Sequence, residues 1–168
     1  RECIESVRDQ SYRNWELCIC DDCSTNEETI KVLQSYKGID SRIKIVRSEK
    51  NLHIAGASNL AAEQATGEFL AFLDHDDTLD SGCIEEIAAA TREYNDIDLL
   101  YTDEDEINFK GEHCDPYFKP DWAPQNLLSV MYILHILTVR KSLFFKLGGF
   151  RKDSAGSQDY DLALRISK

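Results

Sequence analysis

Glycine and proline are scarce in this chain, with 8 glycines and 3 prolines among 168 residues. The most promising loop, Gly56-Ala57-Ser58-Asn59, has too little glycine for a Walker A loop or a dinucleotide-binding fingerprint. Both motifs need several glycines so that the backbone can approach a phosphate. The sequence therefore argues against kinase-like and nicotinamide-dependent enzymes.

Positive charge is also scarce. The chain has 19 Lys and Arg against 31 Asp and Glu, a formal net charge of -12, and no run of basic residues. Nucleic acids and anionic membranes bind extended basic surfaces, so we expect no nucleic-acid partner.

No signal peptide and no apolar run of membrane-spanning length is visible. Six cysteines are too few for a small disulfide scaffold, and a reducing cytoplasm is the expected location.

The length and the order of elements indicate one α/β domain over residues 1–168. Apolar runs typical of buried strands alternate with helical patterns, which predicts a mostly parallel sheet with helices on both faces. Ligands of such sheets bind at the carboxyl ends of the strands. We expect strands at 15–20, 43–46, 68–73 and 98–101. The fourth strand ends in the acidic group at 103–106, the stretch from there to Pro124 reads as irregular, and 127–139 reads as a helix followed by a strand.

Acidic residues follow three of the predicted strands: Asp21-Asp22, Asp74-His75-Asp76-Asp77 and Asp103-Glu104-Asp105. In an extended strand, residues i and i+2 point the same way, so Asp74 and Asp76 should present two carboxylates to one side. Like carboxylates repel unless a cation or a proton compensates them. Mg²⁺ prefers carboxylate oxygens and shares its remaining positions with water and substrate phosphates. The pattern predicts a site for a divalent metal and a nucleotide diphosphate.

Several of these residues also have an ordinary structural interpretation. Acidic residues at strand ends are often solvated loop residues or helix caps, and we favour that reading for Asp77 and Asp80. His135 lies inside an apolar run and is expected to be a core histidine. The aromatic faces of the segment around Trp122 are equally suited to stacking on a sugar and to forming a satellite core.

Short motifs occur in a fixed order along almost the whole chain. They include Asp21-Asp22-Cys23-Ser24-Thr25, Thr66-Gly67-Glu68, Leu73-Asp74-His75-Asp76-Asp77, Pro116-Tyr117-Phe118-Lys119-Pro120-Asp121-Trp122 and Gly156-Ser157-Gln158-Asp159-Tyr160-Asp161. This ordered series resembles the family 2 glycosyltransferases, the inverting sugar-nucleotide-dependent enzymes with the GT-A fold. The similarity is strongest to bacterial members that build lipopolysaccharide or other surface polysaccharides.

The resemblance assigns roles position by position. It implies that Asp22, with Asp21 beside it, contacts the nucleotide base, and that Asp74 and Asp76 form the DXD motif. In that motif the first carboxylate approaches the ribose and the last holds Mn²⁺ or Mg²⁺ at the diphosphate. Asp159 matches the catalytic base.

Weaker assignments complete the expected site. Asn59 and His53 lie where the family's loop and helix approach the nucleotide. Asp103, Asp105, Trp122 and Gln158 are candidates for contacts with the donor or acceptor sugar.

The expected partners are a UDP- or dTDP-linked sugar donor and a saccharide or lipid-linked saccharide acceptor. Peripheral association of the full-length protein with the inner face of the membrane fits such an acceptor. Two other functions remain open at this stage: a sugar nucleotidyltransferase, and an acidic domain that binds a metal or a nucleotide without turnover.

The chain departs from the family pattern in three ways. The first strand of the family, which forms one wall of the base pocket, has no counterpart, and the acceptor-side segments after residue 168 are also missing. Cys23 stands where a glycine is common. We expect the chain to be a catalytic domain truncated at both ends.

Overall fold

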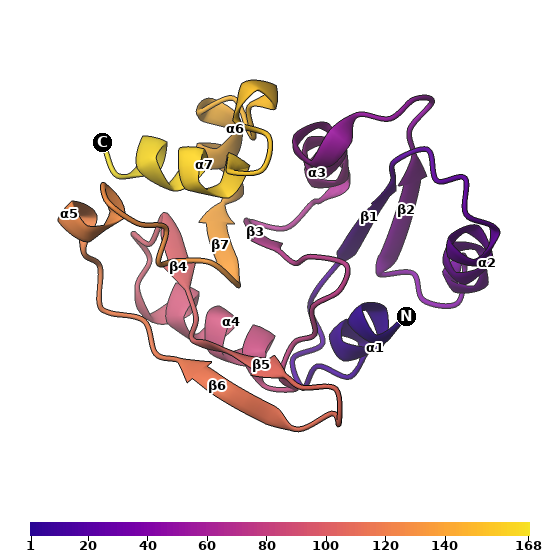
Figure 1. Cartoon of the computed structure of the whole chain (residues 1–168), viewed down its shortest axis with the longest axis horizontal. Helices are drawn as coiled ribbons and strands as arrows, with labels where there is room; N and C mark the ends of the chain where they lie inside the picture. The colour runs from indigo at the N-terminus through magenta and orange to yellow at the C-terminus, as the bar shows by residue number, and fades with distance from the viewer.

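The computed structural model describes all residues from Arg1 to Lys168. Strands β1 (Leu17–Asp21) and β2 (Ile43–Arg47) form a parallel pair in which Leu17 faces Ile43 and Asp21 faces Arg47. Helices α1 (Glu2–Arg8) and α2 (Glu27–Tyr36) belong to this half of the molecule (Figure 1). Both strands lie close to their predicted positions, and the Asn26 side chain caps α2 by accepting from the Glu28 and Thr29 N–H groups.

A second sheet has the order β3-β7-β4, with β3 at Phe69–Phe72, β4 at Leu99–Tyr101 and β7 at Leu137–Arg140. Strand β7 lies between the other two and runs antiparallel to both. The α/β class is confirmed, but the expectation of a mostly parallel sheet is wrong in detail, because β1 and β2 are the only parallel pair. Periodicity locates a strand without revealing which neighbour it pairs with or in which direction.

Helices surround these strands (Figure 1). They are α3 (His53–Gln64), α4 (Cys83–Glu93), α6 (Lys141–Lys146), the 3₁₀ turn η1 (Lys152–Ser154) and α7 (Gln158–Ile166). Helix α3 begins at His53, so Gly56 lies inside the helix rather than in the loop that the sequence suggested. No helix combines the length and the apolar character needed to cross a membrane.

The segment predicted to be irregular contains a hairpin of β5 (Glu104–Ile107) and β6 (His113–Tyr117). Its strands are rich in charged side chains and are mostly exposed, so they lack the apolar alternation that reveals a strand. The helix expected at the start of 127–139 is also wrong. Only the short α5 (Pro124–Leu127) forms there, whereas the predicted strand is present as β7.

The buried side chains form two separate clusters. The larger contains 12 residues and surrounds β7, with Val139, Phe144 and Leu162 fully buried. The smaller contains 5 residues and joins α1, α2 and β2 around Tyr36 and Trp15. The β1–β2 pair and the β3-β7-β4 sheet therefore each have a core of their own.

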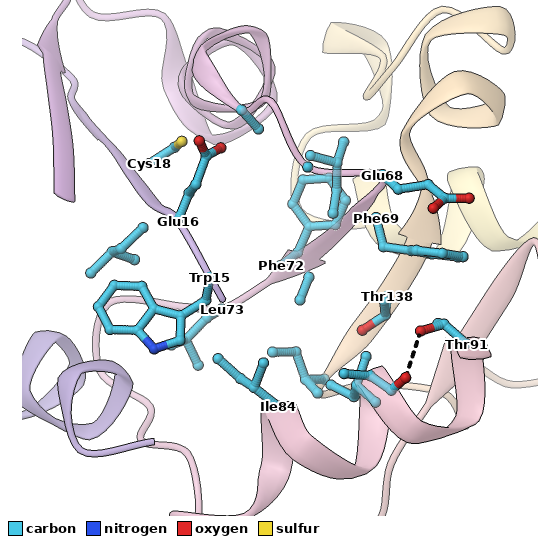
Figure 2. Close-up of a pocket in the computed structure, with 18 of the residues that line it drawn as sticks. Trp15, Glu16, Cys18, Glu68, Phe69, Phe72, Leu73, Ile84, Thr91 and Thr138 are labelled. Atoms are coloured by element: carbon cyan, nitrogen blue, oxygen red, sulfur yellow. Dashed lines mark hydrogen bonds between the residues drawn. The ribbon is translucent and has the colours of Figure 1, made fainter. Parts of the chain in front are cut away.

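A groove of about 830 Å³ runs between β1 and β3, and 18 of its 28 lining residues are hydrophobic (Figure 2). Cys18 of β1, Phe72 of β3 and Ile84 of α4 all face it. Neither β1 nor β3 pairs with another strand across the groove. Ala71 in the middle of β3 is exposed as a result. The two sheets thus approach each other without sharing hydrogen bonds between strands.

Two polar side chains connect distant segments. Glu16 accepts hydrogen bonds from the Thr66 backbone N–H (2.7 Å) and from Lys44 Nζ (2.9 Å). Partial burial would raise the pKa of Glu16, but the hydrogen bonds from Thr66 and Lys44 outweigh it and lower the pKa from 4.5 to about 2. Asn59 of α3 donates to the Phe150 carbonyl and accepts from the Phe150 N–H, both at 2.9 Å.

Candidate active site

The acidic turn after β3 groups a different pair of carboxylates from the one that strand geometry predicts. Because β3 ends at Phe72, residues 74–77 form a turn in which the Asp77 N–H donates to the Asp74 carbonyl at 3.3 Å. A turn brings residues i and i+3 together. Asp74 and Asp77 therefore lie on the same side, while Asp76 is largely exposed and forms an ion pair with His75 at 3.6 Å.

His135, which precedes β7, completes this cluster. Its Nε2 atom lies 3.9 Å from Asp74 Oδ2, and its Nδ1 atom lies 3.9 Å from Asp77 Oδ2. One ligand atom from each of the three residues lies within 4.8 Å of the others. The expectation that His135 is a core histidine is therefore wrong, because its side chain is 43% exposed and faces Asp74. Asp77, which was expected to be a solvated loop residue or a helix cap, lies on the other side of the same imidazole ring.

The electrostatics of this cluster suit a cation. Burial raises the pKa of Asp77, and the negative charges of Asp74, Asp76 and Glu104 raise it further, while His135 acts in the opposite direction. Two carboxylate oxygens and an imidazole nitrogen are a donor set that a divalent metal accepts. Asp74, Asp77 and His135 thus fit the metal that the resemblance implies, with Asp77 rather than Asp76 beside Asp74.

Asp21 and Asp22 end β1, as the sequence predicts, but both carboxylates already have partners. Asp21 is 6% exposed and accepts hydrogen bonds from Arg47 Nη1 (2.5 Å) and from the Ser24 N–H (2.9 Å). Burial would raise the pKa of Asp21, but these hydrogen bonds and the charge of Arg47 outweigh it and lower the pKa. Asp22 accepts from Ser48 Oγ (3.0 Å) and from the Leu52 N–H (2.7 Å).

The loop after β1 turns through Cys23, whose φ of 59° lies in the left-handed region that favours glycine. This backbone geometry fits the glycine that is common at that position of the motif.

The two loosely assigned positions lie at different places on α3. His53 is exposed at the start of the helix. Asn59 faces Phe150, and both ends of its side-chain amide are engaged by the Phe150 backbone. An added Cβ at Gly149 would lie 2.6 Å from Asn59 Oδ1, so the backbone passes close to this amide. The structure gives Asn59 a structural role.

The proposed sugar contacts lie on or near the hairpin. Asp103 accepts a hydrogen bond from the Lys119 N–H (2.8 Å), and Asp105 lies 2.9 Å from His113 Nδ1. Both aspartates are exposed, as is Trp122. Trp122 is therefore not part of either core cluster, which leaves its indole ring open to a ligand.

Asp159 and Gln158 open α7, which lies beside α6 and β7 (Figure 1). Both side chains are half-buried. Asp159 Oδ1 accepts from the Tyr160 N–H (2.8 Å), and Gln158 Oε1 accepts from the Gly156 N–H (3.0 Å). No hydrogen bond or ion pair joins Asp159 to Asp74, Asp77 or His135.

Comparison with known proteins identifies the family. The model of glycosyl transferase family 2 matches residues 1–148. The chain is 38% identical over its whole length to the O-antigen biosynthesis protein RfbC of Myxococcus xanthus, of which it covers 13%. It is 29% identical to a chondroitin synthase of Escherichia coli over 99% of the chain and 24% of that protein. The chain thus spans a quarter or less of the length of these relatives.

Solved structures support the fold. S. aureus TarS in complex with UDP matches with a TM-score of 0.77 and 23% identity, over 96% of this chain and 48% of that one. A mannosyltransferase of Pyrobaculum calidifontis in complex with GDP-Man and Mn²⁺ matches with a TM-score of 0.70 and 20% identity, over 98% and 47% of the two chains. With its mixed α/β architecture and its family match, the chain belongs to glycosyl transferase family 2 and has the GT-A fold.

Proposed function

We propose that this domain transfers a sugar from a nucleotide-diphosphate donor to a hydroxyl acceptor during synthesis of a bacterial surface polysaccharide. The transfer depends on a divalent metal and inverts the anomeric configuration. The convergence of Asp74, Asp77 and His135 carries this proposal, because these ligand atoms lie within 4.8 Å of one another after β3. The complexes of the related folds with UDP and with GDP-Man and Mn²⁺ support a nucleotide-sugar donor.

Asp74, Asp77 and His135 would hold Mn²⁺ or Mg²⁺. When bound, the metal supplies Lewis-acid compensation of the charge that builds up on the departing diphosphate. Asp22, with Asp21 beside it, is proposed to contact the base; Arg47 and Ser48 fix these two carboxylates at the end of β1. Asp76 is exposed and therefore has a lesser role in this arrangement than the family pattern gives it.

Asp159 is proposed as the general base. The acceptor hydroxyl oxygen forms a bond to the anomeric carbon, the bond from that carbon to the diphosphate oxygen breaks, and the hydroxyl proton passes to the Asp159 carboxylate. One displacement of this kind inverts the configuration. Asp159 is half-buried at the start of α7 and accepts only a local hydrogen bond, so its carboxylate retains capacity for a proton.

The test is a titration of the protein with Mn²⁺ and with UDP, dTDP and GDP by calorimetry, followed by a donor-hydrolysis assay. We expect binding of one nucleotide diphosphate that requires Mn²⁺, and release of the nucleoside diphosphate. Release of pyrophosphate would instead identify a nucleotidyltransferase, and binding without turnover would identify a binding domain. In the full-length enzyme, Asp159→Asn should reduce turnover far more than donor binding.

We also propose that the catalytic domain continues beyond residues 1–168 and that one of its strands occupies the groove between β1 and β3. Both strands present unpaired edges to this groove. The buried atoms Trp15 Nε1 and Thr138 Oγ1 line it and lack hydrogen-bond partners (Figure 2). Cys3 Sγ lies 3.4 Å from the Asp74 carbonyl, which puts the start of α1 next to the carboxyl end of β3.

A strand in the groove, parallel to β1, would therefore lead directly into α1 and form a β-α-β unit with it. It would also join the two sheets and fix the distance between Asp22 and Asp74.

A short acetylated peptide of alternating valine and isoleucine, flanked by lysines, serves as a probe for this groove. We expect it to protect the amides of β1 and β3 from hydrogen exchange and to protect Cys18 from alkylation. The same peptide with a central proline, which lacks an N–H donor, is the control. Ala71→Asp should abolish the protection without unfolding the protein, because Ala71 is exposed. Absence of protection by the first peptide would contradict the proposal.

A further inference from the structure

Lys119 is the most deeply buried charged side chain among the ion pairs of this protein. Its side chain is 1% exposed, and its Nζ atom lies 3.0 Å from Glu104 Oε2. Desolvation lowers the pKa of Lys119, which Glu104 partly offsets. Burial of a charge is costly unless ionic and hydrogen-bonding partners compensate it. We therefore expect buried Lys119 to fix specific neighbouring groups, which an exposed lysine would not do.

The hydrogen-bond partners of Lys119 show that it fixes the backbone of His135. Lys119 Nζ donates to the His135 carbonyl oxygen, and the His135 N–H donates to Glu104 Oε2 at 2.8 Å. The same carboxylate oxygen accepts from Lys119 Nζ. Glu104, Lys119 and the two peptide groups of His135 thus form a closed ring of hydrogen bonds. Both polar backbone groups of a single residue are held by one ion pair.

The hairpin explains how residues 104 and 119 meet. Glu104 begins β5 and pairs with Tyr117 at the end of β6, so the chain leaves the hairpin beside the point where it entered. The Lys119 N–H donates to Asp103 Oδ1 at 2.8 Å, which fixes Lys119 against the first strand. The ion pair therefore lies at the base of the hairpin and contacts the segment that precedes β7.

We propose that Glu104 and Lys119 are positioning residues that hold His135 so that its imidazole ring completes a cation site with Asp74 and Asp77. This inference rests on the metal dependence in the proposed function. The ring lies 3.9 Å from both carboxylates, while the ion pair of Glu104 and Lys119 holds its backbone N–H and carbonyl. An imidazole nitrogen among carboxylate oxygens favours transition metals such as Mn²⁺ over Mg²⁺.

The test measures Mn²⁺ affinity by the loss of the electron paramagnetic resonance signal of free Mn²⁺ on titration, with no nucleotide present. Lys119→Met should weaken Mn²⁺ binding about tenfold or more, in the range found when the supports of a metal ligand are removed. It should also reduce the nitrogen coupling of the bound Mn²⁺. Glu104→Gln keeps an acceptor oxygen for both hydrogen bonds and is the second variant, measured in case Lys119→Met does not fold. It should weaken binding to a smaller extent.

Lys44→Met is the matched control, because Lys44 forms an ion pair of similar length with Glu16 (2.9 Å) and contacts neither Glu104 nor His135. It should leave Mn²⁺ affinity unchanged. In a His135→Ala background, Lys119→Met should cause no further loss, because Lys119 acts through His135. A purely structural role would instead lower affinity equally in both backgrounds.

Two results would overturn the inference while leaving the proposed function intact. The first is that Lys119→Met and Glu104→Gln both bind Mn²⁺ as tightly as the wild-type protein, although Asp74→Asn binds it weakly. The other is a loss on Lys119→Met that persists in the His135→Ala background. Failure of the wild-type protein to bind Mn²⁺ at all would overturn the metal dependence itself, and the inference with it.

Discussion

Replacement of Asn59 by alanine separates a structural role for this residue from the nucleotide contact that the sequence predicts. The Asn59 amide forms two hydrogen bonds of 2.9 Å with the backbone of Phe150, which is 5% exposed. Alanine would leave the Phe150 N–H and carbonyl without these partners, at a cost of roughly 1–3 kcal/mol for each buried group. Since two groups lose their partners, we expect Asn59→Ala to lower the free energy of unfolding by about 2–6 kcal/mol.

For a domain of this size, 1 kcal/mol corresponds to about 2–4 °C in Tm, so Tm should fall by roughly 4–24 °C. Urea titrations and thermal melts followed by circular dichroism measure both quantities. The control is Asn51→Ala, because Asn51 accepts one exposed hydrogen bond from the His53 N–H, and its loss should cost about 1 kcal/mol or less. A change below about 0.5 kcal/mol in Asn59→Ala would refute the structural role. A fall in affinity for UDP at temperatures where the variant is folded would instead support the nucleotide contact.

Three further predictions concern other parts of the molecule. Because the pKa of Glu16 is lowered from 4.5 to about 2 on folding, its contribution to stability is present above about pH 4.5 and is lost as the pH falls toward 2. The Glu16→Gln variant should therefore show a weaker pH dependence of urea unfolding over that range. Asp77→Asn should weaken Mn²⁺ binding in calorimetry more than Asp76→Asn does, since Asp77 lies beside His135 and Asp76 is exposed. A larger loss in Asp76→Asn would instead support Asp74 and Asp76 as the metal ligands, as strand geometry predicts. Phe144→Ala empties a fully buried site and should destabilise the domain by about 3–5 kcal/mol, measured by urea titration.

The elements with apolar periodicity could be located from the sequence, and those without it could not. The apolar runs at 15–20 and 43–46 predict β1 and β2, because burial leaves a recognisable apolar pattern in the sequence. The β5–β6 hairpin lacks such a pattern because both of its faces are largely exposed. Strand direction depends on tertiary neighbours, so the antiparallel position of β7 left no local signal.

The candidate site was predictable only in part, for similar reasons. The acidic residues after β1 and β3 were visible because they interrupt apolar runs. Their grouping was not, because it depends on the strand ending at Phe72, and element ends are the least certain part of a sequence-based prediction. His135 was assigned to the core because it lies in an apolar run, far along the chain from Asp74. A buried lysine such as Lys119 has no sequence signature other than its place within the Tyr117-Phe118-Lys119-Pro120 motif.

The central position of β7 determines when this fold can assemble. Residues 137–140 must insert between two strands that were synthesised some forty to seventy residues earlier, so β3 and β4 emerge from the ribosome without their shared partner. Contacts so distant along the chain close slowly and leave apolar edges exposed meanwhile. The nascent chain therefore reaches its native topology only after residue 140 has left the exit tunnel, and shorter N-terminal pieces are expected to be substrates for chaperones rather than independent folding units.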